Sequence, residues 1–346
     1  MDVRLEQLGR RLSDAIRAAL DSGEAAGARR LALEGDGQAR SLAKEYGLMY
    51  RGLGITIRIL LTLIGDTASR ADALSGRAAT ADAAAVVNRF RTDFAHLTER
   101  MWDSAPGVPE APATLDEECA RAARVLDFGE ERFDRDQARL ADEVVRAIDA
   151  GDIARARALV DLKEQERYVP LHDRMVRFMA ESFGWVLRWF GAAELLRFHL
   201  ATAEAQRPGF EKWERMSAAE FTRATAFLLK QHMGQFVVRE DDEKFTIEQT
   251  PCGSGGRLRL KGAYEGPDAL PFVEAPGPLT FGETRLPVYC SHCPIWNGTA
   301  PLAWFGRAHW IFENPSRPDG GCTLYIYKRH DGTPPEYAAK VRIAKN

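Results

Sequence analysis

The chain has 346 residues, of which 45% are hydrophobic and 28% are charged, and its formal net charge is -3. This composition is typical of an ordinary folded protein, and the length exceeds one usual core, so disorder and a single small domain are both disfavoured. The 47 basic residues are balanced by 50 acidic ones, so the chain has no overall positive field and we expect no nucleic-acid partner.

The N-terminus, the most apolar stretch and the cysteines together predict where the protein is located. The N-terminus has charged residues at helical spacing where a signal peptide needs an apolar run. The most apolar stretch, residues 53–64, is interrupted by Arg58 and is far shorter than the ~20 residues that span a bilayer, so we expect a buried helix and no membrane partner. Five cysteines, an odd number without a small secreted framework, favour reduced thiols and a cytoplasmic location.

The first two-thirds of the chain have helical periodicity. Apolar residues recur at spacings of three and four from Val3 to about Met233, which predicts a series of amphipathic helices. Residues 103–114, DSAPGVPEAPAT, contain too many prolines for a helix to continue. We therefore predict a helical region over 1–105, a proline-rich linker over 106–114 and a second helical region over 115–235.

A weak internal repeat spans this linker. Residues 19–31, ALDSGEAAGARRL, match residues 147–159, AIDAGDIARARAL, at a constant offset of 128 with seven identities in thirteen positions. Duplication of a helical unit explains the match, and an alanine-rich composition shared by chance is the alternative.

The residue pattern changes after Gly234, from helical periodicity to short apolar runs. Six short runs rich in β-branched and aromatic residues predict strands: FVVRE (236–240), KFTIEQT (244–250), RLRLKGAY (257–264), RLPVYC (285–290), HWIFEN (309–314) and CTLYIYK (322–328). Segments rich in glycine and proline separate them, and residues 335–343 predict a short closing helix. The expected fold class is α+β, mostly helical over the N-terminal two-thirds, with an antiparallel β-rich domain over 236–346.

Four of the five cysteines lie in this last domain. Cys290 and Cys293 have C-x-x-C spacing, and Cys252 and Cys322 each adjoin a glycine-rich turn. All four could bind zinc or another transition metal in a closed structural site, whereas a mixed set with a histidine leaves a position for water or substrate. A reactive thiol, activated by His292 or Arg257, and inert buried cysteines are the two alternatives.

At these positions the chain resembles a known family. Cys252 after a strand, the pair Tyr289-Cys290, and Gly321-Cys322 before LYIYK are similar to the L-2-amino-thiazoline-4-carboxylic acid hydrolase-like family, over residues 160–330. A more distant similarity is to the vinyl-reductase-type ligand-sensing domain, whose cysteines near the last strands bind zinc. The resemblance implies hydrolysis of a small cyclic C–N or C–S compound. The YCSHC and CGSGG motifs and the long helical N-terminus depart from the family, so we expect a different substrate.

Polar residues outside the cysteines supply further candidates. His172 and Asp173 begin an aromatic helix, where they either face a site or have a structural role. Side chains of adjacent residues point about 100° apart on a helix, so we do not expect these two to form one acid–base pair. His292 and His309 are the predicted proton-transfer groups near the cysteines.

Substrate-binding groups are also expected near the cysteines. Arg257 and Arg259 are predicted to share one face of a strand. This face either holds a carboxylate, with Arg257 as the predicted substrate-binding group, or points to solvent. Trp296 and Trp310 are predicted to line a pocket around the cysteine pair.

Common nucleotide-binding and hydrolase motifs are absent from the sequence. We expect a small-molecule hydrolase or lyase that uses a cysteine-bound metal or a thiolate. A ligand-binding or sensing protein with a structural zinc site is the alternative, and a helical scaffold is a third reading. The expected partner is a small-molecule substrate or ligand, and homodimerisation stays open.

Overall fold

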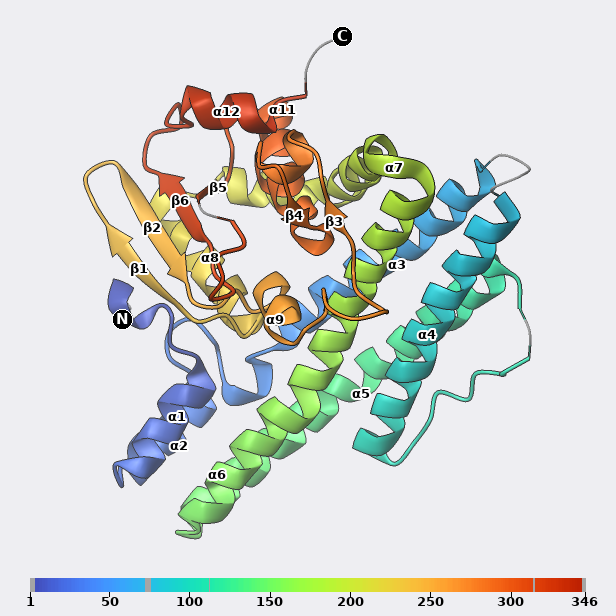
Figure 1. Ribbon diagram of the computed structural model, residues 1–346. Helices are drawn as coiled ribbons and strands as arrows, with labels where there is room; N and C mark the ends of the chain where they lie inside the picture. Colours follow the sequence, from blue (N-terminus) through green and yellow to red (C-terminus); the bar gives the residue numbers. More distant parts are fainter. Residues whose placement is uncertain (1–3, 72–75, 112, 314, 344–346) are drawn as a thin grey trace.

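The computed structural model describes residues 4–71, 76–111, 113–313 and 315–343. Helices dominate the first two-thirds of the chain and an antiparallel sheet lies near the C-terminus, which confirms the predicted fold class (Figure 1). The helices of the first part are α1 (Leu12–Asp21), α2 (Ala25–Glu34), α3 (Gly47–Ser69), α4 (Gly76–Trp102), α5 (Leu115–Asp149), α6 (Ile153–Asp161), α7 (Val169–Glu214) and α8 (Ala218–Gln231). A π-helical segment, Leu162–Tyr168, joins α6 to α7.

The long helices α3, α4, α5 and α7 pack side by side and form the largest core (Figure 1). Ile57, Phe90, Phe133 and Phe178 belong to this core and have almost no exposed surface. The described residues of the segment 103–114 contain no helix, and α5 begins directly after it with a capping box in which the Thr114 side chain accepts from the backbone N–H of Glu117.

The predicted buried helix over residues 53–64 is the central part of α3. Leu53, Ile57, Leu60, Leu61 and Ile64 are buried at the expected spacings of three and four. Within the described residues, the stretch Leu42–Ser69 is the one candidate for a membrane span by length and composition. Of its most apolar window, 56% is buried inside the protein, where α3 contributes to the largest core.

Both copies of the internal repeat form a helix, a tight turn and a second helix. Gly23 and Gly151, which are equivalent at the offset of 128, adopt φ values of 77° and 74° in the two turns. A side chain with a Cβ is strained in this region, so glycine is favoured at both positions. The similar sequences therefore have a structural counterpart in two helical hairpins, α1–α2 and α5–α6.

The two hairpins pack against each other through a shared apolar core. Arg29 Nε binds Asp149 Oδ1 at 2.7 Å, and the equivalent pair of the other copy, Arg157 and Asp21, also forms an ion pair. Reciprocal contacts of this kind, in which residue i binds j and the copy of j binds the copy of i, are characteristic of a two-fold related pair.

The sheet lies beside the bundle of long helices (Figure 1). Its strands β1 (Phe236–Glu240), β2 (Lys244–Gln249), β5 (Ile311–Glu313) and β6 (Thr323–Tyr327) are antiparallel in the order β1-β2-β6-β5, and β3 (Phe272–Val273) pairs with β4 (Leu286–Pro287) in a separate small sheet. In the register, Ile247 of β2 lies opposite Val238 of β1 and Leu324 of β6. These three side chains form a second core with Phe221 and Leu229 of α8, so α8 covers one face of the sheet.

Short helices connect these strands. They are α9 (Gly255–Leu260), α10 (His292–Pro294), α11 (Ala300–Phe305), α12 (Pro335–Val341), the 3₁₀ turns Pro278–Thr280 and Val288–Ser291, and a second π-helical segment, Ile295–Thr299. Two further 3₁₀ turns, Leu5–Gln7 and Leu42–Lys44, lie in the N-terminal part. The short helix predicted over 335–343 corresponds to α12.

One predicted strand is wrong, and a second is confirmed only in part. The run RLRLKGAY contains α9 and no strand, because β6 occupies the free edge of β2 and Leu258 packs instead into the core of the helical bundle. In RLPVYC only Leu286 and Pro287 are extended, and Cys290 lies in a 3₁₀ turn. The last residue of the predicted strand HWIFEN, position 314, lies outside the described residues.

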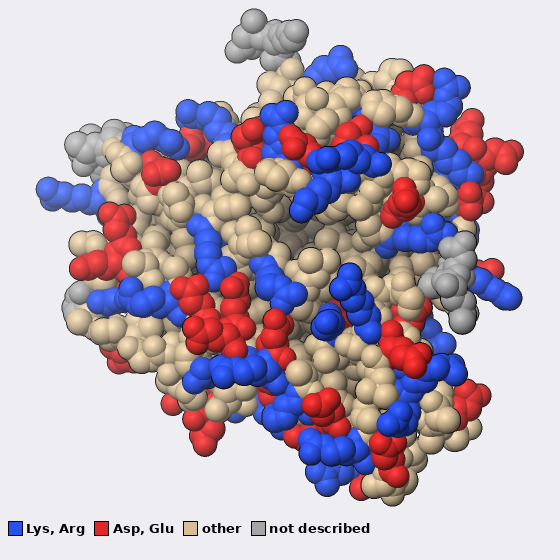
Figure 2. Space-filling view, turned by 180° about the vertical axis from the view of Figure 1, so that it is seen from behind, with Lys and Arg blue, Asp and Glu red and all other residues tan. Residues whose placement is uncertain are grey.

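Charged side chains of both signs are interspersed on the face of the molecule opposite to that of Figure 1 (Figure 2). Many of the charged side chains of the described residues form ion pairs, as in Arg58, which binds both Asp127 and Glu130. No large region of a single sign covers the face that Figure 2 shows.

Candidate functional site

The structure brings the four cysteines of the C-terminal part to one small cavity. Cys252 precedes α9, Cys290 lies in the 3₁₀ turn after β4, Cys293 lies in α10, and Cys322 directly precedes β6. All four side chains line a cavity of about 40 Å³. A cavity of this size holds an ion or one to two water molecules and is too small for a drug-sized molecule.

Glycines allow these segments to approach so closely. A Cβ atom at Gly255 would lie 2.9 Å from the sulfur of Cys290, and one at Gly256 would lie 1.9 Å from the backbone oxygen of Gly320. The CGSGG motif is thus a requirement of packing: α9 begins against the cysteine turn on one side and against the turn before Cys322 on the other.

The surroundings of the thiols favour their protonated form. Burial raises the pKa of Cys290 to about 11, against a smaller lowering effect of Arg259, and raises the pKa values of Cys293 and Cys322 well above their usual range. Arg257, proposed from the sequence as an activating group, binds Asp173 instead. These three thiols therefore lack the environment that generates a nucleophilic thiolate.

The donor set suits a soft transition metal. Four thiols around one cavity match the ligands of zinc and related ions, which bind thiolates and displace their protons. Within the described parts of the chain, no group of three or more His, Cys, Asp and Glu side chains is already arranged to hold an ion.

His292 lies beside the cysteines, and both of its ring nitrogens have hydrogen-bond partners. Its Nδ1 hydrogen-bonds the backbone oxygen of Tyr289, so Nδ1 carries the proton and Nε2 is a bare acceptor in the neutral ring. Nε2 lies 3.6 Å from the sulfur of Cys293. Burial lowers the pKa of His292 to about 4, which keeps the ring neutral at pH 7. Trp296 packs against it, with ring centroids 4.5 Å apart.

His172 and Asp173 form a direct pair, contrary to the expectation from helical geometry. His172 Nδ1 lies 3.0 Å from Asp173 Oδ1, and His172 Nε2 lies 2.9 Å from Nδ1 of His232. The two side chains diverge at their Cβ atoms, but their rotamers let the polar ends meet. His172 is completely buried and burial lowers its pKa, so the ring is neutral.

These hydrogen bonds fix the protons of both histidines. A carboxylate only accepts, so Nδ1 of His172 donates to Asp173 and its Nε2 accepts from Nδ1 of His232. Nε2 of His232 is then also a bare acceptor. Burial, with a further contribution from His172 and His292, lowers the pKa of His232 well below its usual value. No sequence pattern assigns a role to His232, because its partner lies sixty positions away.

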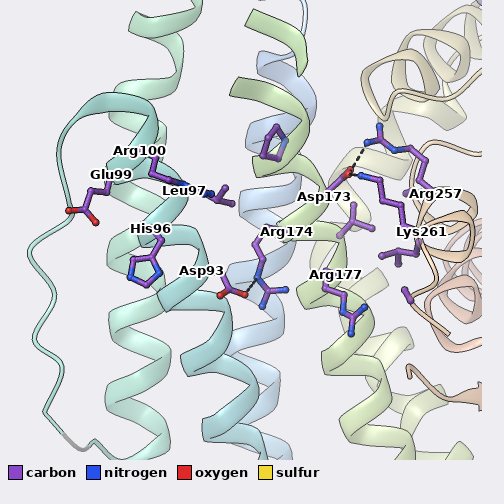
Figure 3. A pocket seen from close by; sticks show the side chains of 15 residues that line it. Asp93, His96, Leu97, Glu99, Arg100, Asp173, Arg174, Arg177, Arg257 and Lys261 are labelled. Atoms are coloured by element: carbon purple, nitrogen blue, oxygen red, sulfur yellow. Dashed lines mark hydrogen bonds and ion pairs between the residues drawn. The ribbon is translucent and has the colours of Figure 1, made fainter. Parts of the chain in front are cut away.

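Asp173 also faces a much larger cleft between α4, α7 and α9, with a volume of about 700 Å³ (Figure 3). Its Oδ2 accepts from Arg257 at 2.7 Å and from Lys261 at 2.6 Å. Although burial alone raises it, the pKa of Asp173 is lowered to about 2 by His172 and these two cations. Ser254 lines both the cleft and the cysteine cavity, so the start of α9 separates the two sites.

Arg257 and Arg259 do not share a face. On a helix, residues two positions apart point about 200° apart, whereas on the predicted strand they would have pointed the same way. Accordingly, Arg257 lines the cleft and Arg259 lines the cysteine cavity, where it also donates to the backbone oxygen of Arg317.

Two of the predicted site residues lie elsewhere. His309 Nε2 pairs with Glu214 at 2.9 Å, and Trp310 donates to Thr225 from within the core beneath the sheet. Neither lines the cysteine cavity. Trp296 donates to the backbone oxygen of His199, and its contact with the cysteine region is through His292.

Both π-helical segments adjoin this region. Leu162–Tyr168 ends four positions before His172, and Ile295–Thr299 follows α10 with Cys293. Such segments are rare in proteins and occur frequently at functional sites. The side chain of Tyr168 also donates to the backbone oxygen of Gln231, next to His232.

Comparisons of the chain with protein-family models, with curated proteins and with solved structures found no match. The resemblance to the L-2-amino-thiazoline-4-carboxylic acid hydrolase-like family therefore stays a prediction.

Proposed function

We propose that the protein is a metal-dependent small-molecule enzyme, a hydrolase or lyase, with its ion held by thiolates from the group Cys252, Cys290, Cys293 and Cys322. The observation that supports this most is the convergence of these four cysteines, from separate segments of the last part of the chain, on one cavity of about 40 Å³. Thiolates that lie close together are the usual ligands of zinc and of other soft transition metals.

An ion held by three of these thiolates would keep one open position, at which it would supply Lewis-acid activation of a substrate or a water molecule. The proton-transfer group in this proposal is His292, since it is neutral, its Nδ1 is held by Tyr289, and its bare Nε2 faces the sulfur of Cys293. His172 and Asp173 act as positioning residues, because His172 is buried and fixes the ring of His232. His309 has no part in the reaction and supports the sheet through Glu214.

The reaction class follows from the family resemblance: cleavage of a C–N or C–S bond in a small cyclic or heteroatom-containing compound. The five cysteines are free, which suits a reducing compartment, so we place the enzyme in the cytoplasm.

A ligand-binding protein with a structural ion is the second candidate. Four thiolates complete a tetrahedral shell and leave no position for a substrate. Asp173, the carboxylate at the base of the large cleft, is engaged by His172, Arg257 and Lys261 and has a lowered pKa, which makes it a weak base. Both observations favour binding without turnover.

Elemental analysis of the purified full-length protein tests the metal centre. We expect about one zinc or other transition-metal ion per chain, lost in the Cys290→Ser and Cys293→Ser variants. Cys119→Ser is the matched control, because Cys119 lies in α5, far from the cavity in sequence and outside its lining. Wild-type protein that is folded and metal-free would refute the proposal.

Turnover separates the two candidates. Metal-loaded protein is incubated with a panel of small cyclic C–N and C–S compounds, with His292→Ala as the variant. An enzyme shows turnover that His292→Ala abolishes while the metal content stays the same. Ligand-dependent thermal stabilisation without turnover in the wild type identifies the binding protein instead.

A further inference from the structure

The cleft between α4, α7 and α9 has the size and the chemistry of a ligand site. Its volume of about 700 Å³ lies within the range usual for small-molecule sites. Five basic and three acidic side chains line it, together with apolar groups such as Leu97, Val176 and Leu258. The cleft thus offers an excess of positive charge beside an apolar surface.

Two of the five cations, Arg257 and Lys261, come from α9 and from the residue that directly follows it. Arg257 and Lys261 are four positions apart, so they lie on the same side of this segment, and both bind the same oxygen of Asp173 (Figure 3). One carboxylate neutralises only one of the two cations. The pair therefore keeps a net positive charge toward the cleft, and the side chain of Lys261 is 60% exposed.

The arginines of α7 are already engaged by acids. Arg174 pairs with Asp93 and with the buried Glu181, and Arg177 pairs with the same Glu181 at 3.0 Å. These contacts shape the base of the cleft and leave less charge for a ligand.

Across the opening, Arg100 of α4 is exposed and forms no hydrogen bond or ion pair with any described residue (Figure 3). The arrangement therefore places the uncompensated cations, Arg100 and the Arg257–Lys261 pair, on opposite sides of one apolar-lined cleft.

We infer that this cleft binds a small molecule with a carboxylate or phosphate group, held by Arg257 and Lys261, and with an apolar body against Leu97, Val176 and Leu258. Guanidinium and ammonium groups are the usual partners of both oxyanions, and the guanidinium of Arg257 makes only one hydrogen bond within the described residues, to Asp173. The inference goes beyond the proposed function: it rests on the cleft, which the start of α9 separates from the cysteine cavity, and it does not depend on a metal.

The test is binding of simple anions to the full-length protein at constant ionic strength. Inorganic phosphate and benzoate are titrated separately by calorimetry, with chloride as the exchanged ion. We expect saturable binding of at least one probe. Lys261→Met should weaken it about tenfold or more, since a charge-assisted hydrogen bond is lost.

Lys44→Met is the matched control, because Lys44 is exposed in a turn of the N-terminal part and does not line the cleft. Saturation by phosphate alone or by benzoate alone supports the inference and identifies the oxyanion. Absence of saturable binding of both probes, or equal weakening by Lys261→Met and Lys44→Met, overturns it. Metal content measured on the same samples shows separately whether the proposed metal centre stands.

Discussion

Nε2 of His172 and Nδ1 of His232 lie 2.9 Å apart, although sixty positions separate the two residues in the chain. Asp173 holds the other nitrogen of His172, so a single carboxylate at the cleft sets the protons of two buried rings. The same carboxylate neutralises charge on α9 through Arg257 and Lys261. Asp173 is therefore the residue through which the cleft and the buried histidines are connected.

The first prediction concerns Asp173→Asn. The variant removes the charge that compensates Arg257 and Lys261 and replaces one acceptor with a donor that faces them. Since hydrogen bonds to charged groups contribute about 1.5–3 kcal/mol, we expect the free energy of unfolding at pH 7 to fall by about this amount. Urea denaturation measures it.

Asp149→Asn is the control for this variant. Asp149 also binds an arginine, but its side chain is 50% exposed, and exposed pairs contribute less than about 1 kcal/mol. If both variants lose the same free energy of unfolding, the hydrogen bonds of Asp173 contribute no more than an exposed ion pair, and the prediction is wrong.

The second prediction is a loss of stability in weak acid. Burial lowers the pKa values of His172 and His199, whereas in the unfolded chain both titrate near pH 6.5. Their contribution is complete above pH 6.5 and is lost as the pH falls below it, because the unfolded state then binds protons that the folded state does not. Each histidine contributes a slope of up to ~1.4 kcal/mol per pH unit.

Urea denaturation at pH 7.5 and 5.5 checks this expectation, with His199→Gln as the variant that should show the smaller difference. Asp173 does not contribute in this window, since its pKa is lowered to about 2 and its effect is lost only between about pH 4 and 2. Equal stability of the wild type at both pH values would contradict the prediction.

The third prediction concerns Gly256→Ala. The added Cβ would lie 1.9 Å from the backbone oxygen of Gly320, so the turn before Cys322 must move away from α9. We expect a loss of about 1–3 kcal/mol in the free energy of unfolding, as for other overpacked sites, together with a loss of the bound metal. Denaturation and elemental analysis measure the two effects.

Gly52→Ala provides the comparison for this variant. Gly52 lies in α3, and a Cβ there would have no neighbour within 4 Å. Alanine favours the helix over glycine by about 0.5–1 kcal/mol, so this variant should be slightly more stable than the wild type. If the Gly256→Ala protein has unchanged stability and metal content, the close approach of α9 to the turn at Gly320 is not needed for either, and the prediction is wrong.

Local sequence patterns were sufficient for much of the fold. The spacing of Leu53, Ile57 and Ile64 predicted the buried face of α3, because helical periodicity depends only on neighbours in the chain. The alternation of apolar and polar residues in Lys244–Gln249 predicted strand β2 for the same reason. The same kind of pattern led to a wrong prediction at residues 257–264. This segment alternates like a strand, but it has no free sheet edge to join and forms α9 instead.

The sequence by itself determined which residues are chemically unusual: four cysteines among glycine-rich turns, and a histidine next to an acid. Only the tertiary structure decided how they are grouped. It placed the cysteines around one cavity, turned Arg257 toward a cleft that the sequence did not indicate, and paired His172 with His232. These relationships join residues that are distant in the chain, and such contacts follow from the packing of whole elements and leave no periodic signal in the sequence.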